Sequence, residues 1–303
     1  MNRVGVVVLS YEGADLTLDC LASLAADDYA DRIEIVVDNG SADSVLSRVA
    51  ELYPGTVRIR MDRNLGFSAG NNAGMAKALD LGCDHVLILN NDTLVECGAV
   101  GAMVAAARPR RVVAPLIVYA EAPDIAWYAG ARFDPRTGMP GRMEGYGRQL
   151  RDVDLAPRPT QRFSGAAVMV PAVAVREVGM FDDDLFFLFE DVEWSLRLRR
   201  AGYQIHFEPS ARIRHRVART QGGEHSLSSY YYGTRNQLAV SQALCPLSGL
   251  AAGRRAATVL GVYLARARRA PRPVAAATAS LEGFRDWRRG RSGQWSRQPS
   301  AAR

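Results

Sequence analysis

The feature that most constrains the fold is a regular alternation of short apolar runs and helix-like segments along the first third of the chain. Four β-branched or aliphatic runs, at residues 4–9, 33–37, 57–61 and 85–89, are separated by helical patterns at residues 14–26, 43–52 and 69–81. Strands that alternate with helices of about ten residues predict βαβ units and a parallel sheet. We therefore expect an α/β fold, an α/β/α sandwich whose sheet is mostly parallel.

Each of these strands is followed by small and polar residues. The segments SYEG, DNGS, DRNLGFSAGNN and NNDT follow the first, second, third and fourth strand. In open parallel sheets, ligands bind at the carboxyl ends of the strands, so these four segments are expected to assemble one site. The N-terminal third is therefore predicted to be a Rossmann-like nucleotide-binding unit. A dinucleotide fingerprint is excluded, because Gly66, Gly70 and Gly74 have the wrong spacing and follow the third strand.

The middle of the chain is less regular. Residues 115–160 are rich in Gly, Pro and Arg, and they predict an irregular excursion or short hairpins. Order resumes with a strand in RFSGAAVMVP, a short helix in AVAVREVGMFD, an amphipathic helix in EDVEWSLRLRRAG, and strands in YQIHFEP and ARIRH. Helix is expected from residue 224 onward.

The C-terminal tail holds the excess positive charge of the chain. Residues 241–303 contain 12 Arg against Glu282 and Asp286, whereas the other 240 residues carry 26 basic and 30 acidic side chains. The segment AATVLGVYLA and its flanking arginines predict a basic helix that lies on an anionic membrane surface or packs on the rest of the protein. The last fifteen residues are predicted to be disordered. No nucleic-acid partner is expected, because the tail has no aromatic interleaving and no recognised motif.

The expected location is the cytoplasm. The N-terminus has no signal h-region, and no apolar stretch approaches the roughly 18 residues that a spanning helix needs. The four cysteines show no metal-binding spacing, which favours reduced thiols. Peripheral contact with the inner face of the membrane stays open because of the basic tail.

Three motifs carry candidate chemistry. Asp38 follows the second strand, where its carboxylate is placed to accept a hydrogen bond from a base or ribose, or else to shape a turn. Asp92 follows the fourth strand, where it is placed to hold Mg²⁺ or Mn²⁺ against a diphosphate, or else to cap a helix. FLFEDVEW sets Glu190, Asp191 and Glu193 among large apolar residues, although carboxylates are rarely buried unless they are paired, metal-bound or catalytic.

The order of the motifs resembles family 2 of the inverting glycosyltransferases, which have the GT-A fold, and is most similar to the rhamnosyltransferase-like branch. The resemblance rests on SYEG, VVDNGS, RNLGFSAGNN, LNNDT, SGAAVMV, FEDVEWSLRLRRAGY, IRH and SSYYYGTRNQL, and it covers about residues 4–236. It implies a GT-A catalytic domain at 1–240, with a nucleotide-binding half at about 1–110 and an acceptor-binding half at about 111–240. A basic helical extension would follow at 241–303. The implied activity is metal-dependent, inverting transfer of a sugar from dTDP-rhamnose or a UDP-sugar to an acceptor hydroxyl.

The resemblance also implies roles for single residues. Asp191 would be the general base of a single displacement with Glu190 in support, and Asp92 with His215 would bind the divalent metal. The implied nucleotide-binding residues are Ser10, Tyr11, Asp38, Asn64, Gly70, Asn90 and Asn91, and the implied acceptor-binding residues are Gly165 and Trp194. Asn90 stands where the family has the first Asp of its Asp-X-Asp motif, so it is not assigned to the metal. Phe187, Phe189 and Trp127 are further candidates for sugar stacking or core packing, and Glu193 is expected to pair with Arg197.

Two other functions are weighed against this one. A sugar-nucleotidylyltransferase would be expected to have a Gly- and Lys-rich loop after the first strand, and LSYEGADL has no Lys or Arg. A non-catalytic nucleotide-sugar-binding scaffold would be expected to lose its base or metal residues, whereas Asp92, Asp191 and His215 are all present. The acceptor is open among a glycan, a lipid-linked intermediate and a small molecule.

Overall fold

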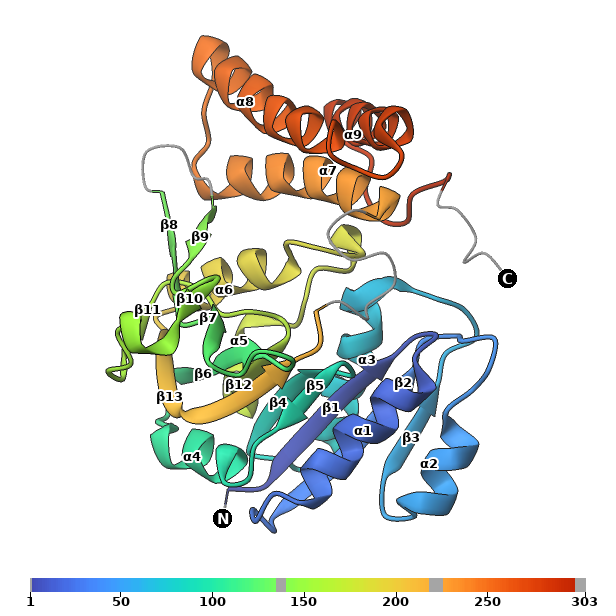
Figure 1. The fold of residues 1–303 in the computed structure, drawn as a ribbon, viewed down its shortest axis with the longest axis vertical. Helices are drawn as coiled ribbons and strands as arrows, with labels where there is room; N and C mark the ends of the chain where they lie inside the picture. Colours follow the sequence, from blue (N-terminus) through green and yellow to red (C-terminus); the bar gives the residue numbers. More distant parts are fainter. Residues whose placement is uncertain (1, 135–139, 218–225, 298–303) are drawn as a thin grey trace.

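The computed structural model describes residues 2–134, 140–217 and 226–297. An α/β body occupies one end of the molecule, and three C-terminal helices are stacked on it at the other end (Figure 1). One large sheet runs through the body, with its main path in the order β10-β7-β6-β12-β4-β1-β2-β3. The expected α/β sandwich with a C-terminal helical extension is confirmed.

The parallel half of the sheet follows the sequence pattern closely. It contains β1 (Val4–Ser10), α1 (Ala14–Ala25), β2 (Arg32–Asp38), α2 (Leu46–Leu52), β3 (Val57–Arg60), α3 (Gly66–Asp80) and β4 (His85–Asn90). Strands β4, β1, β2 and β3 lie side by side in parallel register. Helices α1 and α2 connect β1 to β2 and β2 to β3, so these elements form the expected βαβ units.

Helix α3 lies unusually close to the sheet because small residues face β1. A Cβ on Gly70 would lie 2.4 Å from Leu9 Cδ1, and a Cβ on Gly74 would lie 2.3 Å from Val7 Cγ1. The glycines of RNLGFSAGNNAG therefore serve helix-to-sheet packing. This packing brings the start of α3 to the carboxyl ends of β1 and β2.

The second half of the body extends the sheet in mixed directions. It contains β5 (Thr93–Val95), α4 (Ala99–Ala106), β6 (Arg111–Tyr119), β7 (Ile125–Tyr128), β8 (Ala131–Phe133), β9 (Pro140–Met143), β10 (Arg148–Gln149), η1 (Leu150–Asp152), β11 (Arg158–Thr160), β12 (Ala167–Pro171), α5 (Ala172–Val178), η2 (Asp183–Leu185), α6 (Glu190–Arg200) and β13 (Gln204–His215). Strand β12 is antiparallel to β4, and β13 is parallel to β6.

Strand β6 corrects the prediction of an irregular segment from residue 115. Pro115 lies within a buried nine-residue strand, where a proline removes one ladder hydrogen bond. The partner strand β13 shifts register between Glu208 and Arg212, directly after the position paired with Pro115. The strand tolerates the proline because the partner strand is irregular there. The same shift explains why YQIHFEP and ARIRH, predicted as two strands, form one.

The C-terminal helices are α7 (Leu227–Leu244), α8 (Gly249–Ala267) and α9 (Pro273–Arg288). Helix α7 lies between the α/β body and the α8–α9 pair (Figure 1). Their apolar core, which includes Tyr230, Tyr231 and Val259, is separate from the core of the body. The predicted domain boundary at residue 240 falls inside α7.

The end of the chain is more ordered than predicted. Residues 289–297 fold back onto α7, and Trp295 is 6% exposed there. Disorder of the whole last fifteen residues is therefore wrong for the part that precedes residue 298. No helix in the described ranges is both long and apolar enough to cross a membrane.

Candidate functional site

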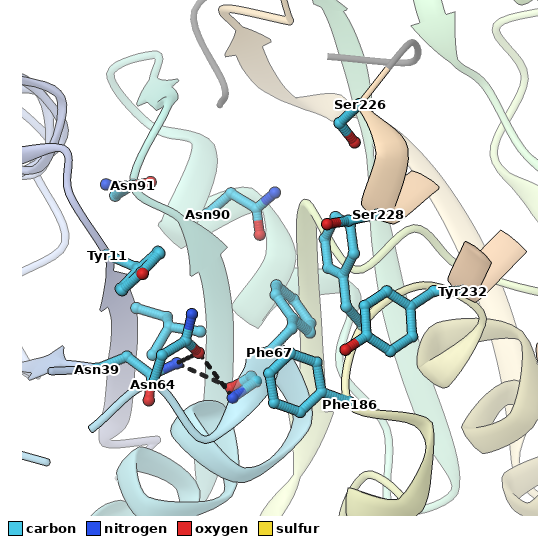
Figure 2. A pocket seen from close by; sticks show the side chains of 13 residues that line it. Tyr11, Asn39, Asn64, Phe67, Asn90, Asn91, Phe186, Ser226, Ser228 and Tyr232 are labelled. Atoms are coloured by element: carbon cyan, nitrogen blue, oxygen red, sulfur yellow. Dashed lines mark hydrogen bonds between the residues drawn. The ribbon is translucent and has the colours of Figure 1, made fainter. Parts of the chain in front are cut away.

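A cavity of about 230 Å³ opens at the carboxyl ends of β1 and β4, next to the start of α7. Four residues predicted to bind the nucleotide line it: Tyr11, Asn64, Asn90 and Asn91. Figure 2 shows two kinds of wall, with Tyr11 and amide side chains on one side and the rings of Phe186 and Tyr232 on the other. The polar wall comes from the parallel half of the body, and the aromatic wall comes from the segment before α6 and from α7.

Two asparagines fix the floor of the polar wall. The Asn39 side-chain amide donates to Asn64 Oδ1 at 3.1 Å and to the Gly66 carbonyl at 2.9 Å. The Asn39 and Asn64 side-chain oxygens in turn accept from the backbone N–H groups of Leu65 and Gly66. Asn39, the second residue of DNGS, is not among the predicted site residues, yet it lines the cavity and orients Asn64 (Figure 2).

Three other residues assigned to the nucleotide, Gly70, Ser10 and Asp38, lie outside the cavity lining. Gly70 packs against Leu9, which corrects its assignment because its missing side chain serves the helix-to-sheet contact. Ser10 is 1% exposed and its hydroxyl accepts from Thr17 Oγ1. This packing gives no support to a direct contact of Gly70 or Ser10 with a nucleotide.

Asp38 is completely buried at the end of β2. Its carboxylate accepts from the Ser41 N–H at 3.0 Å and pairs with Arg60. Burial opposes ionisation, but hydrogen bonds from Ser41 and Ser44 and the charge of Arg60 outweigh it and lower the pKa of Asp38. The carboxylate is thus held in its charged form beside the cavity, and it shapes the turn that carries Asn39. Its contact with a nucleoside stays a prediction.

Asp92 and His215 meet behind the end of β4. Asp92 is 1% exposed and His215 is 6% exposed, and their Oδ1 and Nε2 atoms are 3.1 Å apart. Despite this distance, the relative orientation of the two groups makes no hydrogen bond, and both carboxylate oxygens and both ring nitrogens lack partners among the described residues. Trp127 packs edge-on against the imidazole, with ring centroids 4.7 Å apart.

This pair fits a divalent cation. Buried polar atoms are almost always hydrogen-bonded, so a carboxylate and an imidazole that are both unsatisfied point to a missing partner. No cluster of three or more His, Cys, Asp or Glu is found in the described ranges. Two protein ligands suit a metal whose remaining positions are taken by phosphate oxygens and water. The imidazole ligand favours Mn²⁺ over Mg²⁺.

Glu190 and Asp191 form the first turn of α6. Asp191 Oδ2 accepts from the Gly165 N–H at 2.9 Å, and its Oδ1 accepts from the Val192 N–H at 2.7 Å. Burial raises the pKa of Asp191, although Arg162 and these backbone hydrogen bonds oppose the shift. Gly165, predicted to bind the acceptor, therefore holds the carboxylate of Asp191 through its backbone.

Glu190 is buried, and its Oε2 has no hydrogen-bond partner in the described structure. Burial, reinforced by the charge of Asp191, raises the pKa of Glu190 to about 8. The two neighbouring carboxyl groups therefore differ in environment, since both oxygens of Asp191 accept backbone hydrogen bonds whereas Glu190 Oε2 is buried without a partner in the described structure. Such a pair suits one ionised and one protonated group.

The aromatic candidates have different environments. Trp194 is completely buried and its indole N–H donates to the Gly179 carbonyl, so its prediction as an acceptor contact is wrong. Phe187 is 36% exposed and lines the cavity, whereas Phe189 packs in a small apolar cluster with Leu185 and Val192.

Two further expectations concern α6 and the start of α7. Glu193 pairs with Arg197 at 2.7 Å, which confirms the expected ion pair. Sequence reasoning missed the cavity-lining residues Phe186, Ser226, Ser228 and Tyr232. For Ser228 and Tyr232 the available signal was the run SSYYYGTRNQL, which the resemblance included but to which it gave no contact.

The sequence matches known proteins over most of its length. The family described as glycosyltransferase-like family 2 matches residues 2–229. An N-acetylglucosaminyl-diphospho-decaprenol L-rhamnosyltransferase of Mycobacterium tuberculosis is 30% identical over 240 residues, which cover 72% of this chain and 77% of the relative. An N-acetylglucosaminyltransferase of Mesorhizobium japonicum is 36% identical over 98 residues, covering 30% of this chain and 22% of that protein.

Solved structures share the fold at low sequence identity. GalNAc-T7 with UDP, GalNAc and Mn²⁺ aligns with a TM-score of 0.59 at 18% identity, covering 85% of this chain, which spans only 54% of that protein. The mannosyltransferase PcManGT of Pyrobaculum calidifontis, in complex with GDP-Man and Mn²⁺, aligns with a TM-score of 0.55 at 18% identity, covering 94% of this chain and 82% of that one. These likenesses show a GT-A fold.

Proposed function

Because this chain belongs to glycosyltransferase-like family 2, and is therefore a glycosyltransferase, we propose that it transfers a sugar with inversion from a nucleoside-diphosphate donor to an acceptor hydroxyl. Asp191 is the general base of this proposal. The observation that carries it is the half-buried carboxylate of Asp191, held by the Gly165 and Val192 N–H groups near an Asn-lined cavity of about 230 Å³. Family membership sets aside the sugar-nucleotidylyltransferase alternative.

The proposed reaction is a single displacement. The acceptor oxygen forms a bond to the anomeric carbon, its proton passes to the Asp191 carboxylate, and the bond from that carbon to the donor phosphate oxygen breaks with its electron pair. The raised pKa of Asp191 makes it a stronger base than an exposed aspartate. The two backbone N–H groups fix which oxygen lone pairs can face the acceptor. Protonated Glu190 would donate a hydrogen bond to a second acceptor oxygen.

Asp92 and His215 would hold the divalent metal, since both are buried and unsatisfied. A bound cation would neutralise the charge that develops on the departing diphosphate. Trp127 would keep the imidazole oriented toward Asp92, because its ring packs edge-on against His215. Tyr11, Asn64, Asn90 and Asn91 would contact the nucleotide from the polar wall.

We further propose a deoxyhexose donor and a lipid-linked acceptor. Support comes from the rhamnosyltransferase relative, whose name gives a polyprenyl diphosphate sugar as its acceptor. dTDP-rhamnose is therefore the first donor to test, with UDP-sugars next. A lipid-linked acceptor also suits peripheral membrane contact through the basic helices α8 and α9, which lie beside the cavity-lining helix α7.

The test is nucleoside diphosphate release from a panel of dTDP-, UDP- and GDP-sugars, with N-acetylglucosaminyl-diphospho-polyprenol as acceptor and with Mn²⁺, Mg²⁺ or EDTA. We expect turnover of one donor that EDTA abolishes. Asp191→Asn should lower kcat by about 10² to 10⁴-fold, the usual contribution of a general base. Glu193→Gln is the matched control, since it changes a neighbouring carboxylate that pairs with Arg197.

Two outcomes would count against the proposal. If Asp191→Asn keeps the wild-type kcat, Asp191 is not the base. If no donor turns over but the wild type and Asp191→Asn both bind a nucleotide sugar tightly, a non-catalytic nucleotide-sugar-binding scaffold becomes the better description.

A further inference from the structure

The backbone that leads into Glu190 and Asp191 adopts an unusual conformation. Phe186, Leu188 and Phe189 have positive φ angles of 61°, 67° and 73°. Large side chains rarely adopt this region, because Cβ then approaches the carbonyl oxygen. Strained backbone of this kind persists only where the surroundings over-determine it. The structure must therefore contain groups that hold residues 185–189.

Asn236 of α7 supplies most of the hydrogen bonds to this segment. Its side-chain amide nitrogen lies 2.9 Å from the Leu185 carbonyl, 2.9 Å from the Phe187 carbonyl and 2.8 Å from the Leu188 carbonyl. The side chain is completely buried. The two N–H bonds of one amide group are thus shared among three carbonyl groups of the strained segment.

Arg235 reinforces the same contact. Its Nη2 donates to the Asp184 and Leu185 carbonyls at 3.1 and 3.0 Å, and its Nε donates to Asn236 Oδ1 at 2.8 Å. The bond to Oδ1 fixes which end of the Asn236 amide faces the segment. Arg235 is 2% exposed, so these bonds form away from competing water.

The end of the chain completes the arrangement. The Gly293 carbonyl accepts from Arg235 Nη1 at 2.6 Å, and the Gly293 N–H donates to the Asp184 carbonyl at 2.6 Å. Trp295 stacks on Tyr231 with ring centroids 4.6 Å apart, and its backbone N–H donates to the Tyr232 hydroxyl. Residues 292–295 therefore pack on α7 and contact Asp184, the residue directly before the strained segment.

The opposite side of the segment rests on the nucleotide-binding half. The Phe186 carbonyl accepts from the Phe67 N–H at 2.6 Å, and a Cβ on Gly66 would lie 2.4 Å from that carbonyl oxygen. The Phe186 ring stacks on Tyr232, and both line the cavity. The segment is thus held between the start of α3 and α7, with the cavity beside it.

We propose that Arg235 and Asn236, locked by the C-terminal residues 292–295, are positioning residues that set the strained segment 185–189 and so aim the carboxylate of Asp191 and the aromatic wall at the substrates. This proposal rests on the proposed function, because the segment matters to catalysis only if Asp191 is the base. It gives the C-terminal tail a role in the active site. A purely structural role would change stability without changing kcat of the folded enzyme.

The first test is Asn236→Ala, assayed well below its melting temperature. A displacement of the base of about 1 Å can cost on the order of 10²-fold, so we expect kcat to fall by about 10 to 100-fold while KM for the donor changes much less. Gln242→Ala is the matched control, because it removes an amide from the same helix whose bonds go to Leu247 and Arg255. Equal kcat in Asn236→Ala and Gln242→Ala would overturn the proposal.

The second test concerns the tail and decides the matter if Asn236→Ala does not fold. Trp295→Ala removes the stack on Tyr231, whereas Trp295→Phe retains an aromatic ring. Both variants keep the backbone N–H that donates to the Tyr232 hydroxyl. We expect a kcat loss in Trp295→Ala that Trp295→Phe restores. A wild-type kcat in Trp295→Ala would contradict a role for the tail.

A readout that needs no catalysis separates this proposal from the proposed function. Hydrogen exchange of the amides in residues 184–189 should be faster in Asn236→Ala and Trp295→Ala than in the wild type and in Gln242→Ala. Faster exchange together with an active Asp191→Asn would mean that the positioning of the segment is right and the general base is wrong. Unchanged exchange would overturn the positioning role itself.

Discussion

The carboxyl group of Glu190 is buried beside the carboxylate of Asp191, and its Oε2 has no hydrogen-bond partner in the described structure. This environment makes the stability of the protein depend on pH. Its pKa rises from an ordinary value of 4.5 to about 8 in the folded protein, through burial and then the charge of Asp191. Between these two values the folded state binds more protons at this site than the unfolded state. The free energy of unfolding therefore falls as the pH rises through this window, by on the order of a few kcal/mol.

Glu190→Gln should remove this dependence, since an amide has nearly the same shape and does not ionise. We expect the melting temperature to fall between pH 5 and pH 8.5 by several degrees more in the wild type than in Glu190→Gln. Thermal unfolding followed by circular dichroism measures the difference. Glu51→Gln, at an exposed position of α2, is the control for losing one carboxylate. Parallel curves for the wild type and Glu190→Gln would show that Glu190 is ionised in the folded protein.

Single residues were predictable where the side chain itself indicates the chemistry, as a carboxylate or an imidazole does. Asp92 and His215 were paired through the motif order, and the structure brings them within 3.1 Å. Trp194 and Gly70 were misassigned, because an aromatic ring or a glycine beside a motif serves packing as readily as binding. Only the fold decides which way the Trp194 side chain points.

At the scale of elements, periodic patterns predicted the strands and helices of the parallel half well. They did not predict contacts between segments that are far apart in sequence. The alternation of strands and helices identified β1 to β4 within a few residues. Strand β6 was missed in part because a proline argues against a buried strand, and the bulge in β13 that accommodates it is remote in sequence. The aromatic wall was missed for a similar reason, since Phe186 and Tyr232 are far apart in the chain and meet only in the fold.

Helix α9 packs so closely on α7 at Gly283 that we expect a larger residue there to be destabilising. A Cβ on Gly283 would lie 2.3 Å from the Tyr231 carbonyl oxygen and 3.3 Å from the Arg235 backbone nitrogen. Gly283→Ala must therefore push α9 away from α7, and overpacking of this kind costs about 1–3 kcal/mol. Because Tyr231 and Arg235 support the segment before Asp191, kcat should fall as well. Urea unfolding and steady-state kinetics measure the two effects.

Gly261→Ala is the matched control for that change. A Cβ at Gly261 would meet nothing within 4 Å, in the middle of α8. Alanine should therefore stabilise the protein by about 0.5–1 kcal/mol through helix propensity. A Gly283→Ala protein as stable as Gly261→Ala would mean that α9 does not pack on α7 as described.

At the scale of the whole molecule, positive charge is concentrated on the helical end. Within residues 226–297, the only acidic side chains are Glu282 and Asp286, and they are 7% and 5% exposed. Both are turned inward, toward Trp295 and Tyr231 respectively. The exposed charges of α8, α9 and their flanks are therefore all positive, contributed by Arg254, Arg268, Arg269, Arg272, Arg285, Arg288, Arg289, Arg291 and Arg297.

Exposed apolar side chains accompany these arginines. Leu250 is 85% exposed at the start of α8 and Val274 is 81% exposed at the start of α9, and Val262 and Leu281 are about half exposed. Basic helices with exposed aliphatic residues suit the surface of an anionic membrane. Helix α7 separates α8 and α9 from the α/β body (Figure 1), and its first turns line the cavity. A membrane under α8 and α9 would therefore lie near the cavity, where the proposed lipid-linked acceptor would enter.

Vesicle binding tests this arrangement on the full chain. We expect co-sedimentation with phosphatidylglycerol-containing vesicles, weak binding to phosphatidylcholine vesicles, and loss of binding as salt screens the charges. Changing Arg268, Arg269, Arg288 and Arg289 to Gln should lower the affinity by at least tenfold, since each basic residue near such a surface contributes about 1 kcal/mol. Changing Arg58, Arg108, Arg151 and Arg176 of the α/β body to Gln is the control with equal loss of charge. Equal effects of the two sets would mean that net charge, and not the helical end, determines binding.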